Sequence, residues 1–101
     1  MHDMSKLAHL KHLDAGAPDG MKAVWAFDKA AMAPGAIPVK YKELIALGVA
    51  LTTQCPYCLE IHGKRAREAG ATDAEISEAV VIAAALNAGA AITHGTHLIG
   101  D

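Results

Sequence analysis

The chain has 101 residues and a formal net charge of −2, with 52% hydrophobic and 20% charged residues. It has no basic stripe for nucleic acid and no apolar N-terminal segment of the kind that a signal peptide needs. The longest apolar stretch, residues 79–92, is interrupted by Asn87 and is shorter than the roughly 18 residues of a membrane span.

This composition predicts one cytoplasmic domain, residues 1–101, with neither nucleic acid nor a membrane as a partner. The apolar fraction is high for so short a chain, because a small domain buries a low fraction of its surface. We therefore expect further copies of the chain to cover the remaining apolar surface, in an obligate and closed homo-oligomer.

The first third of the chain predicts helices separated by turn residues. An N-terminal helical extension, residues 1–17, contains a first helix over about residues 5–14 with Ser5 as its N-cap. A break at residues 15–19 follows, within which Pro18 is suited to the first turn of a second helix. Pro34-Gly35 ends that helix, since proline disfavours a helical residue before it.

The core motif region, residues 37–98, predicts the rest of an all-α fold of about five helices, because strand patterns are nearly absent. The first helix of this region is apolar on most sides, which argues for burial. Thr72 and Glu75 have the spacing of a capping box for the last and longest helix. The three helices are expected over residues 38–53, 56–70 and 72–98, with Gly70 as the C′ glycine that ends the second of them.

The segment Cys55-Pro56-Tyr57-Cys58 is a CxxC at the start of the predicted central helix. Two thiols at this spacing close a disulfide with little backbone movement. Unpaired N–H groups and the positive end of the helix dipole favour the thiolate, which is the species that attacks peroxides and disulfides. A CxxC alone is shared by redox enzymes and zinc sites.

Two further polar residues accompany the cysteines. His62 follows Cys58 by four residues, so it lies one turn away on the same helix face and is placed to take the thiol proton, directly or through one water. Glu43 belongs to the preceding apolar helix, where a carboxylate is costly without a partner. A thiol–imidazole–carboxylate relay would supply that partner.

A zinc-binding structural or interaction module is the main alternative from the residues themselves. Cys55, Cys58 and His62 would give three ligands, and His94 or His97 a fourth. It is the less favoured interpretation, because structural zinc sites usually join two separated ligand pairs.

The pattern E-x11-C-x2-C-x3-H, formed by Glu43, Cys55, Cys58 and His62, resembles the core motif of the AhpD-like alkyl hydroperoxidases in the carboxymuconolactone decarboxylase family. The resemblance covers roughly residues 37–98. It implies a helical fold that assembles as trimers or hexamers, an antioxidant activity that reduces hydroperoxides, and regeneration by an external dithiol.

The resemblance also implies a role for each residue of the motif. Cys58 would be the attacking thiol, Cys55 the resolving thiol, His62 the base and Glu43 the far end of the relay. The helix dipole instead favours the first cysteine, but His62 is spaced to meet Cys58. Tyr57 stands where the best-known members carry an additional histidine, which implies a thinner relay and an altered peroxidase activity.

We therefore expect a thiol-dependent peroxidase or disulfide reductase, with no metal and no organic cofactor. Few polar residues surround the motif, which favours organic hydroperoxides over hydrogen peroxide. The remaining alternative is an acid–base enzyme of the carboxymuconolactone decarboxylase type that uses His62 and Glu43. It is disfavoured because the decarboxylase branch of the family lacks the CxxC.

Overall fold

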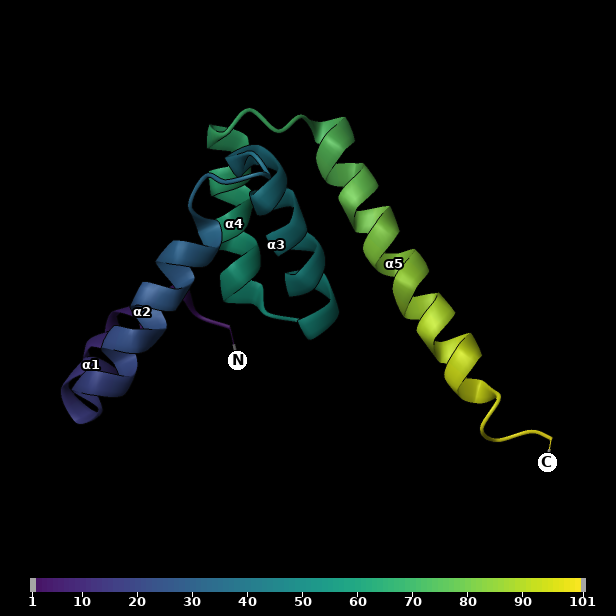
Figure 1. The fold of residues 1–101 in the computed structure, drawn as a ribbon, viewed down its shortest axis with the longest axis horizontal. Helices are drawn as coiled ribbons and strands as arrows, with labels where there is room; N and C mark the ends of the chain where they lie inside the picture. Colours follow the sequence, from purple (N-terminus) through teal and green to yellow (C-terminus); the bar gives the residue numbers. More distant parts are fainter. Residues whose placement is uncertain (1, 101) are drawn as a thin grey trace. The chain divides into compact units, whose positions relative to one another are not determined.

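A computed structural model describes residues 2–100, and among these residues the secondary structure is helical, with no strand (Figure 1). The predicted all-α fold is confirmed. The elements in chain order are η1 (Met4–His9), α1 (Leu10–Gly16), α2 (Pro18–Met32), α3 (Val39–Thr53), α4 (Pro56–Glu68) and α5 (Asp73–Gly95). The chain divides into two compact units, Met1–Val39 and Lys40–Asp101, which are described separately.

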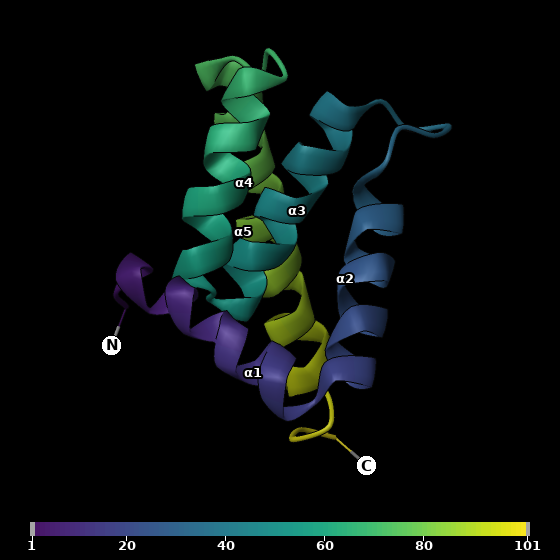
Figure 2. The same cartoon turned by 90° about the vertical axis from the view of Figure 1, so that its left-hand side faces the viewer.

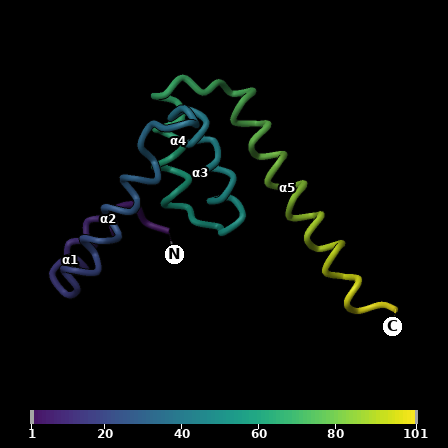
Figure 3. Tube along the Cα trace, viewed as in Figure 1, coloured from purple at the N-terminus to yellow at the C-terminus, as the bar shows by residue number. Residues whose placement is uncertain are grey.

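The first unit is a helical hairpin. Figure 3 shows the chain doubling back between α1 and α2, and the indole Nε1 of Trp25 donates a hydrogen bond of 2.7 Å to Asp14 Oδ1. None of η1, α1 and α2 has a buried residue. These helices therefore form no buried core of their own.

The start of the chain differs from the prediction in two details. The predicted first helix begins as the 3-10 helix η1, and its N-cap is Asp3 rather than Ser5, because Asp3 Oδ1 accepts hydrogen bonds from the amide and hydroxyl of Ser5. The predicted break at residues 15–19 is reduced to Ala17, since α1 continues to Gly16 and α2 starts at Pro18.

The second unit contains α3, α4 and α5, and Figures 1 and 2 both show α3 and α4 side by side. Its core is small and rich in alanine, which lets helices approach closely. Ala66 is fully buried, and Leu47 and Ala71 are buried beside it. The partly buried side chains packed against this cluster are Leu44, Leu59 and Ile76.

The connection from α4 to α5 has the local signals that the sequence predicted. Gly70 has a φ of 93°, which a glycine adopts without the penalty of a Cβ. The Thr72 hydroxyl accepts a 3.1 Å hydrogen bond from the Glu75 amide, and Glu75 Oε1 accepts one of 2.9 Å from the Thr72 amide. The predicted capping box is confirmed.

Glu75 also ties α5 to the first turn of α3. Its Oε2 lies 2.9 Å from Lys40 Nζ, which sits 5.0 Å from the ring centroid of Tyr41. The Thr72 amide first, and then Lys40, hold the pKa of the Glu75 carboxyl below its usual value. The same contact raises the pKa of Lys40. One carboxylate thus caps α5 and orients it on α3.

The burial that was predicted for α3 is wrong for the single chain. Only Glu43, Leu47 and Ala50 are buried in this helix, whereas Ile45 is 53% exposed and Val49 is 55% exposed. Burial follows the side of α3 that packs against α4, where Glu43 and Leu47 lie, and the other apolar side is left open.

The last helix is even less covered. Only Ala83 is buried in α5, and the helix ends at Gly95, three residues before the predicted end at Leu98. By length and composition α5 would suffice to cross a membrane. The shorter apolar stretch in the sequence therefore does not exclude a span. The core helix of a protein can have the same length and composition. A helix that is apolar on all sides is normally surrounded either by lipid or by other protein.

The capping box gives a stability prediction. Thr72→Ala removes the side-chain acceptor for the Glu75 amide, so the free energy of unfolding should fall by about 1 kcal/mol. Urea denaturation at one fixed protein concentration measures the change. Thr93→Ala is the matched control, because its exposed hydroxyl bonds the Ala90 carbonyl within α5 and lies outside the cap. An equal effect of both substitutions would contradict the assignment.

Candidate dithiol site

The CxxC lies where the chain passes from α3 to α4. Gln54 adopts a φ of 57°, a left-handed conformation that is uncommon without glycine. It reverses the chain at the end of α3, and the Cys55 amide donates a hydrogen bond of 3.0 Å to the Ala50 carbonyl. Pro56 then starts α4, where its missing N–H costs nothing. This reversal sets the cysteines at the start of α4.

Cys55 and Cys58 are joined by a disulfide, with their Cα atoms 5.3 Å apart. Cys55 is the N-cap of α4, and its sulfur accepts a hydrogen bond of 3.2 Å from the Cys58 amide. Sulfur thereby fills the place that a serine or aspartate oxygen takes at other helix starts. Both cysteines are partly buried.

Glu43 and His62 face one another between α3 and α4. Glu43 is 3% exposed, and its Oε2 lies 2.6 Å from His62 Nδ1. The His62 side chain is 16% exposed. A buried carboxylate is costly without a partner, and the imidazole provides it. The structure therefore brings together the two residues that the sequence placed nineteen positions apart.

The same contact determines which nitrogen of His62 is available for chemistry. When the Glu43 carboxylate is ionised it only accepts hydrogen bonds, and the proton of a neutral His62 ring is then on Nδ1. Nε2 then holds the lone pair, and among the described residues no hydrogen bond reaches it. His62 lies one turn after Cys58 on α4. The carboxylate thus orients an imidazole whose Nε2 can take a proton.

Other predicted residues do not join this group. His94 and His97 lie edge to face with ring centroids 5.9 Å apart at the end of α5. Within residues 2–100, no three metal-ligating side chains converge. The described part of the chain therefore does not assemble the ligand set of the zinc interpretation. Tyr57 is partly buried in the first turn of α4.

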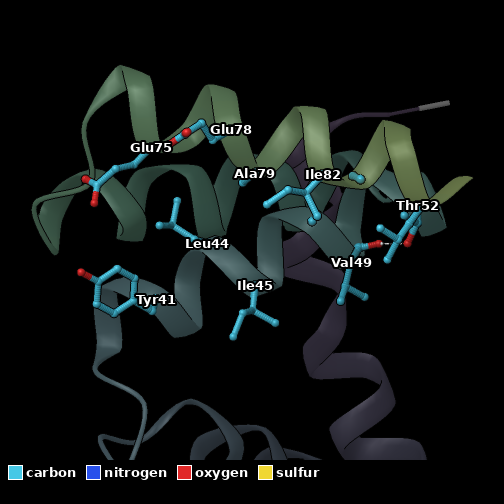
Figure 4. A pocket seen from close by; sticks show the side chains of 12 residues that line it. Tyr41, Leu44, Ile45, Val49, Thr52, Glu75, Glu78, Ala79 and Ile82 are labelled. Carbon is cyan, nitrogen blue, oxygen red and sulfur yellow. Dashed lines mark hydrogen bonds between the residues drawn. The ribbon is translucent and has the colours of Figure 1, made fainter.

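An apolar groove of about 620 Å³, which was not predicted from the sequence, lies between α3 and α5 (Figure 4). From α3 it is lined by Tyr41, Ile45 and Val49, which recur every four residues, and Glu75 and Glu78 lie at one end. None of the four motif residues lines it. This four-residue spacing on α3 indicates a single apolar stripe along one side of the helix. The expectation from the sequence was instead that the whole helix is buried.

Comparisons with known proteins assign the family. Residues 18–99 match the model of the carboxymuconolactone decarboxylase family. The chain belongs to this family. The resemblance inferred from the four-residue motif is confirmed at this level, and the AhpD-like motif is consistent with it.

Individual relatives agree with this assignment. Uncharacterized protein 4 in the cox locus of Paracoccus denitrificans is 49% identical over 72 residues, which cover 71% of this chain but only 65% of that protein. A carboxymuconolactone decarboxylase family protein from Legionella pneumophila, solved in its apo form, has a TM-score of 0.76 at 27% identity, over 91% of this chain and 82% of its own. A structure from Methanobacterium thermoautotrophicum has a TM-score of 0.79 at 27% identity, over 85% and 97%.

The Glu43–His62 pair predicts strongly non-additive effects on stability. His62→Leu leaves a buried carboxylate without its partner and should lower the free energy of unfolding by about 3 kcal/mol. Adding Glu43→Leu should recover most of that loss, because no unpaired charge remains. Denaturation of the oxidised protein, at one protein concentration, measures the single and double variants. Additive losses would contradict the pairing.

Proposed function

We propose that the protein is a thiol-dependent oxidoreductase that reduces hydroperoxides, and disulfides by the same exchange chemistry. The observation that supports this most is the 2.6 Å contact of Glu43 with His62, one helical turn from a CxxC. The family match and the CxxC support the general class. The reduction of hydroperoxides is the part that we propose beyond this class.

The proposed cycle begins with the reduced pair. The Cys58 thiolate attacks the hydroperoxide ROOH, the O–O bond breaks, and the products are a Cys58 sulfenic acid and the alcohol ROH. Cys55 then attacks the sulfenic sulfur, which forms the disulfide and releases water. An external dithiol reduces this disulfide by two exchange steps and becomes a disulfide itself.

His62 and Glu43 manage the protons of this cycle. Nε2 takes the Cys58 proton before attack, and the resulting imidazolium is stabilised by the Glu43 carboxylate. The proton then goes to the alkoxide that leaves. A partly buried base held against a fixed carboxylate keeps one tautomer through these steps, so no ring rotation is needed.

The substrate class and the compartment extend the proposal. We propose organic hydroperoxides as the substrates, as the resemblance of the motif implies, with an antioxidant role in the cytoplasm. The groove between α3 and α5 adds no support to this, because neither cysteine lines it.

An acid–base enzyme of the carboxymuconolactone decarboxylase type is the second candidate. The Glu43–His62 contact also supports it, since the contact is made without either sulfur. The two functions differ in their need for thiols. Activity that survives alkylation of both cysteines would favour this candidate over the peroxidase.

The proposal includes a homo-oligomer, with a second copy seated on the open sides of α3 and α5. The chain is 52% hydrophobic, yet few side chains are buried in the described residues. Leu86, in the groove wall, is 68% exposed. Patches of this kind on soluble proteins mark interfaces. A trimer or hexamer would cover them without a membrane.

The peroxidase proposal predicts the fate of the thiols. One equivalent of an organic hydroperoxide added to reduced protein should remove both free thiols, as counted by a thiol reagent. Cys55→Ser should accumulate a sulfenic acid at Cys58 that a dimedone probe traps, because the resolving thiol is missing. Cys58→Ser is the matched control and should trap none.

Two other results would contradict the peroxidase function. Thiols that survive the hydroperoxide would reject the peroxidase function. Stoichiometric zinc in protein purified without added metal, and lost in Cys58→Ser, would support the zinc module instead.

The oligomer proposal makes a separate prediction. Leu86→Glu places a charge in the covered groove wall and should shift the particle to the mass of one chain in sedimentation velocity. Ala74→Glu, on the exposed first turn of the same helix, should leave the mass unchanged. A wild-type protein that sediments as a single chain, or that needs detergent to stay in solution, would contradict the proposal.

A further inference from the structure

The two sulfur atoms of the disulfide have different surroundings. The Cys55 sulfur is at the N-cap position of α4 and accepts the Cys58 amide hydrogen bond at 3.2 Å. The Cys58 sulfur belongs to the third residue of the helix, one turn before His62. An anion on Cys55 therefore has a fixed N–H donor and the positive end of α4, whereas a charge on Cys58 relies on a histidine.

This asymmetry bears on the reductive half of the cycle. In thiol–disulfide exchange the attacking thiolate chooses between two sulfurs, and the better-stabilised thiolate leaves faster. With Cys55 as the leaving group, the N–H donor is already in place and no reorganisation is needed. With Cys58 as the leaving group, the Cys58 amide is hydrogen-bonded to the Cys55 sulfur and does not stabilise the thiolate that leaves.

We propose that the external dithiol attacks the Cys58 sulfur and expels Cys55 as a thiolate held by the Cys58 amide. This inference rests on the proposed dithiol function and adds the site of contact with the reductant. Oxidant and reductant would then meet the same sulfur at different stages. Cys55 would form bonds with Cys58 alone.

The reduction proceeds by two exchange steps. A thiolate of the dithiol bonds to the Cys58 sulfur, the Cys55–Cys58 bond breaks, and its electron pair stays on Cys55. The second thiol of the reductant loses its proton and attacks the reductant's own sulfur in the mixed disulfide. The electron pair of that bond passes to Cys58, and the reductant leaves as a disulfide. Two electrons have moved, and solvent or His62 accepts the protons.

The hydrogen bond from the Cys58 amide to the Cys55 sulfur also favours the oxidative half of the cycle. After the peroxide has converted Cys58 into a sulfenic acid, a thiol must attack it as a thiolate. A Cys55 kept ionised by the helix start is ready for this attack. The N-cap position thus makes Cys55 the leaving group in reduction and the nucleophile in resolution.

The test is the regiochemistry of a trapped mixed disulfide, with glutathione as the probe. Oxidised wild-type protein is mixed with glutathione, quenched in acid after milliseconds to seconds, and alkylated with N-ethylmaleimide. Fragmentation of the peptide between the two cysteines locates each group. We expect glutathione on Cys58 and maleimide on Cys55, with a preference of at least tenfold. A preference for Cys55, or an even distribution, would overturn the inference.

A second measurement uses matched variants that each keep one thiol. The pH dependence of iodoacetamide alkylation is recorded for Cys58→Ser, which retains the amide donor to the Cys55 sulfur, and for Cys55→Ser, which retains His62 one turn from Cys58. Alkylation of Cys55 should reach half its maximum at a lower pH than that of Cys58. The reverse order would overturn the inference.

Neither experiment uses a peroxide, so the two proposals can fail separately. Glutathione on Cys58 together with thiols that resist hydroperoxides would retain the inference and reject the peroxidase. Glutathione on Cys55 together with rapid loss of thiols to hydroperoxide would do the opposite.

Discussion

The hydrogen bond between Glu43 and His62 is the contact on which the second unit of the chain depends. It joins α3 to α4 at 2.6 Å beside a very small core. A carboxylate that is almost fully buried cannot be left without a partner, so the register of the two helices is fixed by a polar pair rather than by large side chains. That register also sets the orientation of the imidazole. The fold and the proposed proton relay thus share one interaction.

A core built on alanine leaves large apolar side chains outside it. Ala66, Ala71 and Ala83 allow close helix contacts but bury little area each. The apolar residues that a larger core would use lie outside, on the open sides of α3 and α5. This arrangement suits a chain whose remaining surface is covered by protein after folding. The same argument applies to the first unit, whose helices bury no residue of their own.

The sequence predicted the features that depend on neighbouring residues. The capping box of Thr72 and Glu75, the left-handed Gly70 and the start of α4 at Pro56 each follow from local geometry, and the structure has all three. The Glu43–His62 contact was predicted from spacing and the cost of a buried charge. The groove between α3 and α5 was missed, because hydrophobic pattern alone does not say which apolar side is covered within one chain.

The position of Cys55 reconciles two arguments that conflicted in the sequence. The helix dipole favours ionisation of the first cysteine, whereas the spacing of His62 favours attack by the second. A thiol that attacks the substrate needs a neighbouring base, because the base removes its proton at each turnover. A resolving thiol needs only to be an anion at the right time, and a fixed N–H donor is sufficient for that. In the proposed cycle the dipole and the histidine therefore act on different sulfurs, so the two arguments do not conflict.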